Sequence, residues 1–298
     1  MQILDKGEWD GLDGSMFGTL RRLFTGGAEA EPQGIPGLIA ALGNEDEAAR
    51  RGAVEALGNR GPEAIPALSD ALRHESALVR AGACSALALV GPRGKEALTP
   101  LLSRLTDSAA EVRRAAITTV GGMGPEANVE LTRIHTMVKS DADAGVRAAT
   151  AVALARLGVT GHNNQKTDCV ATLNRVLFND AEVDEVRDAC ILGMWDSWQE
   201  GRSQVKEAFA KGEAAMRARV VRVLGSNGPR PVCPSDILIK ALDEEALRAE
   251  AARGLGEVVV DRFDRERAVP ALERWIEADE DATREAVREA LERIVASS

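Results

Sequence analysis

The feature that most constrains this 298-residue chain is a repeat marked by regularly spaced arginines. The positions one before and three, four and seven after each arginine are mostly apolar, and these positions share one face of an α-helix. Each arginine is therefore predicted to lie on an amphipathic helix. The eight arginines, 30 to 40 residues apart, are Arg50, Arg80, Arg113, Arg147, Arg187, Arg217, Arg248 and Arg284.

A helix-stop signal follows each of the early arginines. Glycine stands eleven residues after the arginine in several copies, and proline often comes next, as in Gly61-Pro62 and Gly91-Pro92. Glycine accepts the left-handed conformation at a helix end, and proline cannot continue a helix. A second apolar-periodic segment precedes each arginine helix, so each unit is predicted to be helix, turn, helix and stop.

Helix pairs of this kind cannot bury their apolar faces alone, so they must stack on one another. Small residues recur two and six positions after the arginines, as in Gly52 with Ala56 and Gly82 with Ala86. We expect them to form the seams between units, which agrees with an aromatic content of only 3% and no Tyr. The prediction is an all-α fold, a right-handed α-solenoid of about eight stacked two-helix repeats over residues 34–298, preceded by a separate segment 1–33.

The motif that runs from Ile35-Pro36 through Val54 and Leu57 to Gly61-Pro62 resembles HEAT-like repeats of the type first associated with phycobilin lyases. The resemblance covers nearly the whole chain after residue 33. It implies the architecture and says little about function, because such repeats are used mainly as binding scaffolds.

The repeated arginines allow two interpretations. They could form a ladder that binds phosphates, or they could join neighbouring units through hydrogen bonds and ion pairs. Acidic residues lie four positions before several of them, a spacing that permits pairing along one helix. The structural interpretation is favoured. The acids are Asp46, Asp143, Glu244 and Glu280.

The repeat is broken in its fifth copy. That copy comes after a 40-residue step with a polar insertion near His162, and it places Trp195 and Trp198 where the other copies mostly have Gly or Ala. Broken local rules mark functional or strained sites, and Trp is enriched in binding hot spots. The two indoles are predicted either to contact a partner or to fill the gap between repeats five and six.

The exposed side of the arginine helices is expected to line the concave face. Its middle is apolar around Val152 and Leu192, and the stretch that contains Arg219, Arg222 and Arg253 is basic. An apolar centre with a charged rim is typical of protein-binding surfaces. The hypothesis is that a partner segment docks along repeats four to seven, and the alternative is a solvated face without function.

Segment 1–33 contains one amphipathic pattern. Phe17, Leu20 and Phe24 share a helical face, and a Gly- and Glu-rich stretch follows. We expect a helix that either caps the solenoid or docks on a partner groove or a membrane surface. Its acidic residues argue against stable membrane association by this segment alone.

Catalytic chemistry has little support in the sequence. The three histidines are scattered and no known catalytic motif occurs, so no catalytic residue, metal ligand or cofactor is predicted. His74-Glu75 resembles the iron-binding pairs of deoxyhypusine hydroxylase, but that family needs several such pairs. Two enzyme alternatives stay open: a subunit of a phycobilin-lyase-like enzyme, and a HEAT-like alkylpurine DNA glycosylase that uses Trp195, Asp196 and Trp198.

Net charge and cysteine usage complete the expectation. A net charge of −10 gives no general attraction for nucleic acid, and four cysteines without a CxxC motif favour a reducing, cytoplasmic compartment. No apolar run is long enough to cross a bilayer. The sequence therefore predicts a non-catalytic scaffold or adaptor that binds another protein, with no nucleic acid partner and no evident small-molecule substrate.

Overall fold

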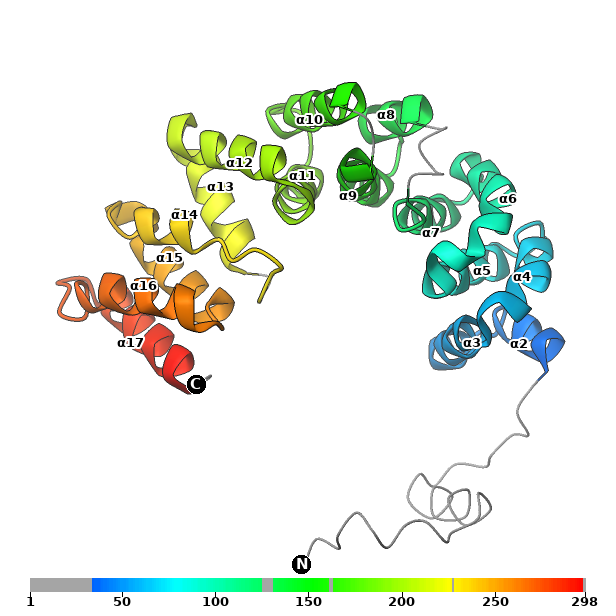
Figure 1. The fold of residues 1–298 in the computed structure, drawn as a ribbon, viewed down its shortest axis with the longest axis horizontal. Coiled ribbons are helices and arrows are strands. Elements are labelled where there is room, and N and C mark those ends of the chain that lie inside the picture. The colour runs from blue at the N-terminus through cyan, green and yellow to red at the C-terminus, as the bar shows by residue number, and fades with distance from the viewer. Residues whose placement is uncertain (1–33, 125–130, 161–162, 227, 297–298) are drawn as a thin grey trace, which may run out of the picture.

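The computed structural model describes residues 34–124, 131–160, 163–226 and 228–296, and every regular element within them is helical. The helices form a continuous arc of stacked pairs (Figure 1). From α2 to α11 the first helix of each pair visibly lies on the outer side of the arc and the second on the inner side. The all-α solenoid is thereby confirmed.

Eight pairs lie in the described residues. The first helices are α2 (Ile35–Ala41), α4 (Ile65–Ala71), α6 (Leu98–Ser103), α8 (Leu131–Ser140), α10 (Asn163–Leu177), α12 (Gln199–Lys211), α14 (Ser235–Ala241) and α16 (Arg262–Glu273). The second helices are α3 (Glu47–Arg60), α5 (Ala77–Val90), α7 (Ala110–Val120), α9 (Ala144–Thr160), α11 (Asp184–Ser197), α13 (Ala214–Gly225), α15 (Glu245–Val258) and α17 (Asp281–Ala296). Short 3-10 turns η2 (Gly61–Ala64), η3 (Gly91–Ala97) and η4 (Arg104–Thr106) connect the early helices. Each repeated arginine lies near the start of a second helix.

The Gly-Pro stops end the second helix in the first two repeats. Gly61 and Gly91 end α3 and α5 with φ of 59° and 66°, a region that residues with a Cβ rarely adopt. Gly158 is different, because α9 continues through it to Thr160. A Cβ at Gly158 would lie 3.1 Å from the Trp198 ring, so this glycine makes room for an indole.

Small residues form the seams between second helices, but not at all the predicted positions. A Cβ on Gly225 of α13 would lie 2.8 Å from the Cα of Gly254 on α15, and one on Gly256 would lie as close to Ala290 on α17. At both seams, the residue eight positions after the arginine of one repeat faces the residue six positions after the arginine of the next repeat. Gly52, two after its arginine, has nothing within 4 Å and is not a seam residue.

The arginines join neighbouring repeats. Arg80, Arg113 and Arg147 each donate two hydrogen bonds to an acid in the turn of the next repeat, at 2.7–3.0 Å, and two more to carbonyls of their own turn. The acids, named here the ladder acids, are Asp107, Asp141 and Glu182. This arrangement supports the structural interpretation over a phosphate ladder, because four of the five N–H donors of each of these three arginines are already occupied.

The acids that lie four residues before the arginines in sequence have other partners in the structure. Asp46 and Asp143 accept hydrogen bonds from the backbone N–H groups that begin their own helices. Glu244 pairs with Arg217 of the preceding repeat, at 3.2 Å. At the last junction Trp275 takes the place of the acid, with Arg248 stacked 3.7 Å from its ring centroid.

The ladder shifts the acids' ionisation. For Asp107 and Glu182, partial burial alone would raise the pKa, but hydrogen bonds and charge from Arg80 and Arg147 outweigh it and lower the pKa. For Asp141 the hydrogen bond from Arg113 is the largest effect, and it lowers the pKa against the opposing effect of burial. The ladder therefore holds these carboxylates in their charged form.

Two sequence predictions concern the N-terminal segment and membrane-spanning helices. The segment 1–33, with Phe17, Leu20 and Phe24, lies outside the described residues, so its role as a cap or docking helix stays a prediction. Within the described residues no helix combines the length and apolar character needed to span a bilayer.

Candidate partner-binding groove

Trp195 lies inside the protein. Its side chain is 1% exposed on α11, and its indole N–H donates a hydrogen bond of 2.8 Å to the carbonyl oxygen of Val232, in the segment before α14. The predicted partner contact at Trp195 is therefore wrong for this structure, because the ring has no surface to offer. The alternative interpretation, a wedge between repeats five and six, describes its position.

Trp198 is buried on the opposite side of repeat five. It is the single residue between α11 and α12, it is 7% exposed, and its ring packs toward Gly158 and borders a pocket between α10 and α12. Its indole nitrogen is buried and has no hydrogen-bond partner in the described part of the chain. Trp198 thus lies away from the concave stripe with which it was predicted to act.

The concave face does carry a groove where the apolar stripe was expected. Its volume is about 430 Å³, and it spans the three second helices α9, α11 and α13. Val152 and Leu192 lie in it together with small residues, and Arg222 stands at its edge. The other lining residues are Gly145, Ala148, Ala149, Glu185, Asp188, Ala189, Val223 and Ser226.

Two of the three predicted basic residues are neutralised. Arg219 donates hydrogen bonds to both Asp184 and Asp188, the latter at 2.6 Å, and Arg222 lies 3.1 Å from Asp188. The interaction with Arg219 lowers the pKa of Asp184. The expected basic stretch is therefore an ion-pair network with acids of the preceding repeat. Arg253 is exposed on α15 and is not among the groove residues.

The seam between α11 and α13, beside the groove, carries a large residue, Trp195. In the seam register described above, Gly225 meets Gly254, and a Cβ on Gly193 of α11 would come within 3.0 Å of the Ala155 side chain on α9. The same register pairs Trp195 of α11 with Val223 of α13. Both are larger than the glycine or alanine found at these positions in most repeats, and Val223 lines the groove. The sequence showed that Trp195 breaks the pattern of small residues, but it did not show which residue Trp195 faces.

His135 on α8 and Cys169 on α10 lie close together. His135 bonds Thr172 at 2.8 Å, and its other ring nitrogen lies 4.0 Å from the Cys169 sulfur. Burial raises the pKa of Cys169 to about 12 and lowers that of His135. In the described ranges no cluster of His, Cys, Asp and Glu could hold a metal ion.

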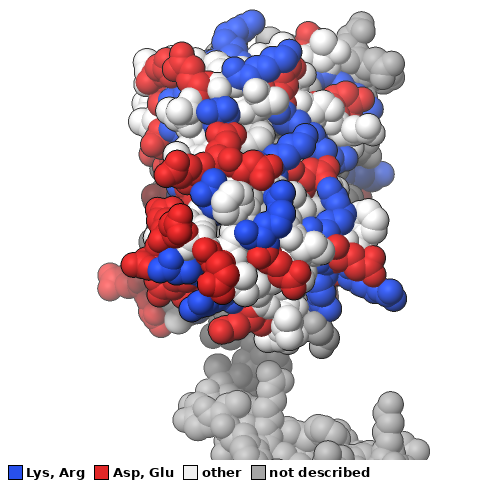
Figure 2. Space-filling view, turned by 90° about the vertical axis from the view of Figure 1, so that its left-hand side faces the viewer, with Lys and Arg blue, Asp and Glu red and all other residues white. Residues whose placement is uncertain are grey.

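The residues suggested for a DNA glycosylase do not gather. Trp195 is buried, Trp198 faces the α10–α12 side, and Asp196 is paired with Arg230 at 2.8 Å. Figure 2 shows the side formed by the last repeats, where acidic and basic side chains are interspersed. That face offers no broad basic field for nucleic acid.

Stacked helix pairs, an arginine ladder between them and a groove on the inner helices define an α-solenoid repeat protein. The family model of HEAT repeats matches residues 35–121 and 98–195, which together span more than half of the chain, so the chain belongs to the HEAT-repeat family. The predicted resemblance is thereby confirmed. No curated protein matches the sequence.

Several solved structures are similar in fold. Human deoxyhypusine hydroxylase in complex with glycerol is 21% identical, with 89% of this chain and 97% of that chain covered at a TM-score of 0.37. The complex of CpcE and CpcF of phycocyanin lyase from Nostoc sp. is 26% identical over 54% of this chain and 98% of that chain, at 0.39. An engineered protein is 17% identical, with 89% and 97% covered, also at 0.39.

Proposed function

We propose that this chain is a non-catalytic scaffold that binds a segment of another protein in the concave groove formed by α9, α11 and α13. The observation that carries the proposal is the composition of that groove. Val152, Leu192 and neighbouring alanines form an apolar floor, and Glu185, Asp188 and Arg222 are charged residues at the same site. Apolar centres with polar rims are the usual design of protein interfaces.

The shape of the groove indicates what the partner must supply. The floor consists of small and medium side chains, and both Val152 and Leu192 are only half buried in the free chain. A partner segment with one or two apolar side chains would cover them and exclude water, which is the main source of affinity at such sites. Because Arg222 is already paired with Asp188, it contributes to orientation more than to net charge.

The test begins with Leu192→Glu, which places a charge on the groove floor at a half-buried position. The partner is captured from the native host with the wild-type chain, identified, purified, and titrated against each variant by calorimetry. We expect Leu192→Glu to weaken binding at least about tenfold, equivalent to about 1.4 kcal/mol. The matched control is Val295→Glu on α17, where the side chain is 65% exposed, and it should bind like wild type.

Charge reversal separates the groove from the rest of the concave face. Arg222→Glu would place a carboxylate beside Asp188 and should weaken binding, whereas Arg253→Glu lies outside the groove and should not. Equal affinity of the Leu192→Glu variant and the wild type for the purified partner would refute the proposed site. Circular dichroism at 222 nm verifies that each variant keeps its helical content.

A further inference from the structure

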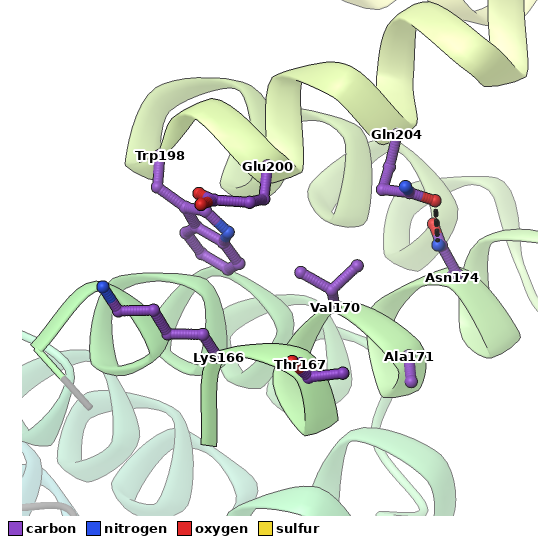
Figure 3. Close-up of a pocket in the computed structure, with 8 residues that line it drawn as sticks. All are labelled: Lys166, Thr167, Val170, Ala171, Asn174, Trp198, Glu200 and Gln204. Atoms are coloured by element: carbon purple, nitrogen blue, oxygen red, sulfur yellow. Dashed lines mark hydrogen bonds between the residues drawn. The ribbon is translucent and has the colours of Figure 1, made fainter. Parts of the chain in front are cut away.

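The pocket between α10 and α12 lies on the side of repeats five and six away from the concave groove, and the scaffold function does not use it. Its volume is about 510 Å³, within the range of small-molecule sites. Figure 3 shows the indole of Trp198 projecting from the start of α12 toward α10. Lys166, Thr167 and Val170 lie on the facing side, so two helices of different repeats contribute the walls.

The indole of Trp198 is the feature that indicates a ligand. The side chain is more than nine-tenths buried and lines the pocket, yet its Nε1–H donates to no acceptor among the described residues. Buried polar groups are almost always paired, so an unpaired donor at a pocket wall requires an explanation. An acceptor atom of a bound molecule would satisfy it.

The other walls narrow the chemistry of that molecule. Lys166 is half buried at one end and supplies a positive charge, and Val170 with Ala171 gives an apolar surface. Asn174 donates a 2.7 Å hydrogen bond to Gln204, and this pair of amides closes the far end (Figure 3). Beside the Glu200 carboxylate, the Thr167 hydroxyl and the two amides, the lining offers a ligand an ammonium, an indole N–H and an apolar wall.

We propose that the α10–α12 pocket binds a small organic monocarboxylate, whose oxygens accept from Trp198 Nε1 and pair with Lys166 while its apolar chain covers Val170 and Ala171. The indole nitrogen is covered by protein atoms in this structure, so binding requires a local opening. Glu200, an exposed side chain drawn beside the indole in Figure 3, would have to turn outward to provide it. This site goes beyond the scaffold function, because it lies on another face and takes a different class of ligand.

The experiment uses hexanoate as the probe and the full-length chain labelled with ¹⁵N. The indole N–H resonances are followed by NMR, with Trp198→Phe and Trp195→Phe assigning two of them. Hexanoate should shift the Trp198 resonance downfield in a saturable manner at concentrations up to about 10 mM. The Trp195 resonance should stay in place, because that N–H is already bonded to Val232.

Two further titrations decide the chemistry. Lys166→Gln should weaken hexanoate binding at least about tenfold, whereas Lys206→Gln, on α12 but paired with Asp236 outside this pocket, should not change it. Hexanamide, which has the same chain without the charge, should bind at least about tenfold more weakly than hexanoate. The proposal is overturned if hexanoate leaves the Trp198 resonance unmoved, if Lys166→Gln binds like wild type, or if the amide binds as well as the acid.

Discussion

Removing one arginine from the ladder should destabilise two neighbouring repeats and leave the others intact. Arg113→Met deletes two hydrogen bonds to Asp141, at 2.8 and 2.7 Å, and two to the carbonyl oxygens of Asp107 and Ser108. The two side chains of the pair are only 15% and 8% exposed, so water cannot fully replace these bonds.

The expected cost follows from that geometry. Breaking a buried ion pair by removing one partner costs about 3–5 kcal/mol. Asp141 keeps a hydrogen bond from the Asp143 N–H, and both side chains retain some exposure, so we expect about 2–4 kcal/mol. Asp141→Asn should cost a similar amount, and the double variant clearly less than the sum, with a coupling energy of about 1.5–3 kcal/mol.

Urea denaturation followed by circular dichroism gives the stability, and hydrogen exchange measured by mass spectrometry locates the effect. In a solenoid each repeat contacts only its neighbours, so protection should fall in α7 and α9 and stay unchanged in α13 to α17. The matched control is Arg114→Met, the same change one residue further along α7 at an exposed position, with an expected effect within about 0.5 kcal/mol. Equal stabilities of the Arg113 and Arg114 variants would refute the ladder.

Three further predictions concern pH, the wedge and the seams. The ladder acids have lowered pKa values in the folded chain. The stability they contribute is therefore complete above the ordinary carboxylate pKa of about 4, and it is lost as the pH falls through the lowered values. The urea midpoint of the wild type should fall more steeply below about pH 4 than that of Arg113→Met. Trp195→Ala should lower the free energy of unfolding by about 3–5 kcal/mol, and Trp195→Phe by about 1–2 kcal/mol, measured by calorimetry or urea titration. The reason is that the ring fills the junction and its N–H donates a hydrogen bond as well. Equal losses for the two variants would contradict the wedge. Gly225→Ala should destabilise by about 1–3 kcal/mol because its Cβ would lie 2.8 Å from a backbone carbon of α15, whereas Gly52→Ala, with open space around it, should be neutral or stabilising in the same thermal-unfolding assay.

Much of the architecture could be predicted because repeats report it many times over. Arginine spacing, apolar periodicity and the Gly-Pro stops each indicated the same helix pairs, and local signals that agree define a fold strongly. The glycine at position 158 shows the limit of such counting. It occupies the stop position, yet α9 continues past it, and the ring of Trp198 packs against it from another repeat.

The candidate site was only partly predictable. Val152, Leu192 and Arg222 share a helical face in each unit, so their meeting on the concave side followed from the repeat phase. The neutralisation of Arg219 and Arg222 did not follow, because Asp184 and Asp188 lie more than thirty residues earlier in the chain and reach them only through stacking.

The sequence by itself determined the period, the helix pairs and the kind of residue each seam requires, because these depend on contacts repeated within and between neighbouring units. Tertiary structure alone decided what the irregular fifth copy does. Its two tryptophans have the same side chain and lie three residues apart, yet one donates a hydrogen bond as a wedge between repeats and the other lines a pocket as a donor with no acceptor among the described residues. That difference arises from which neighbouring helices the rings meet, a fact that a one-dimensional pattern does not contain.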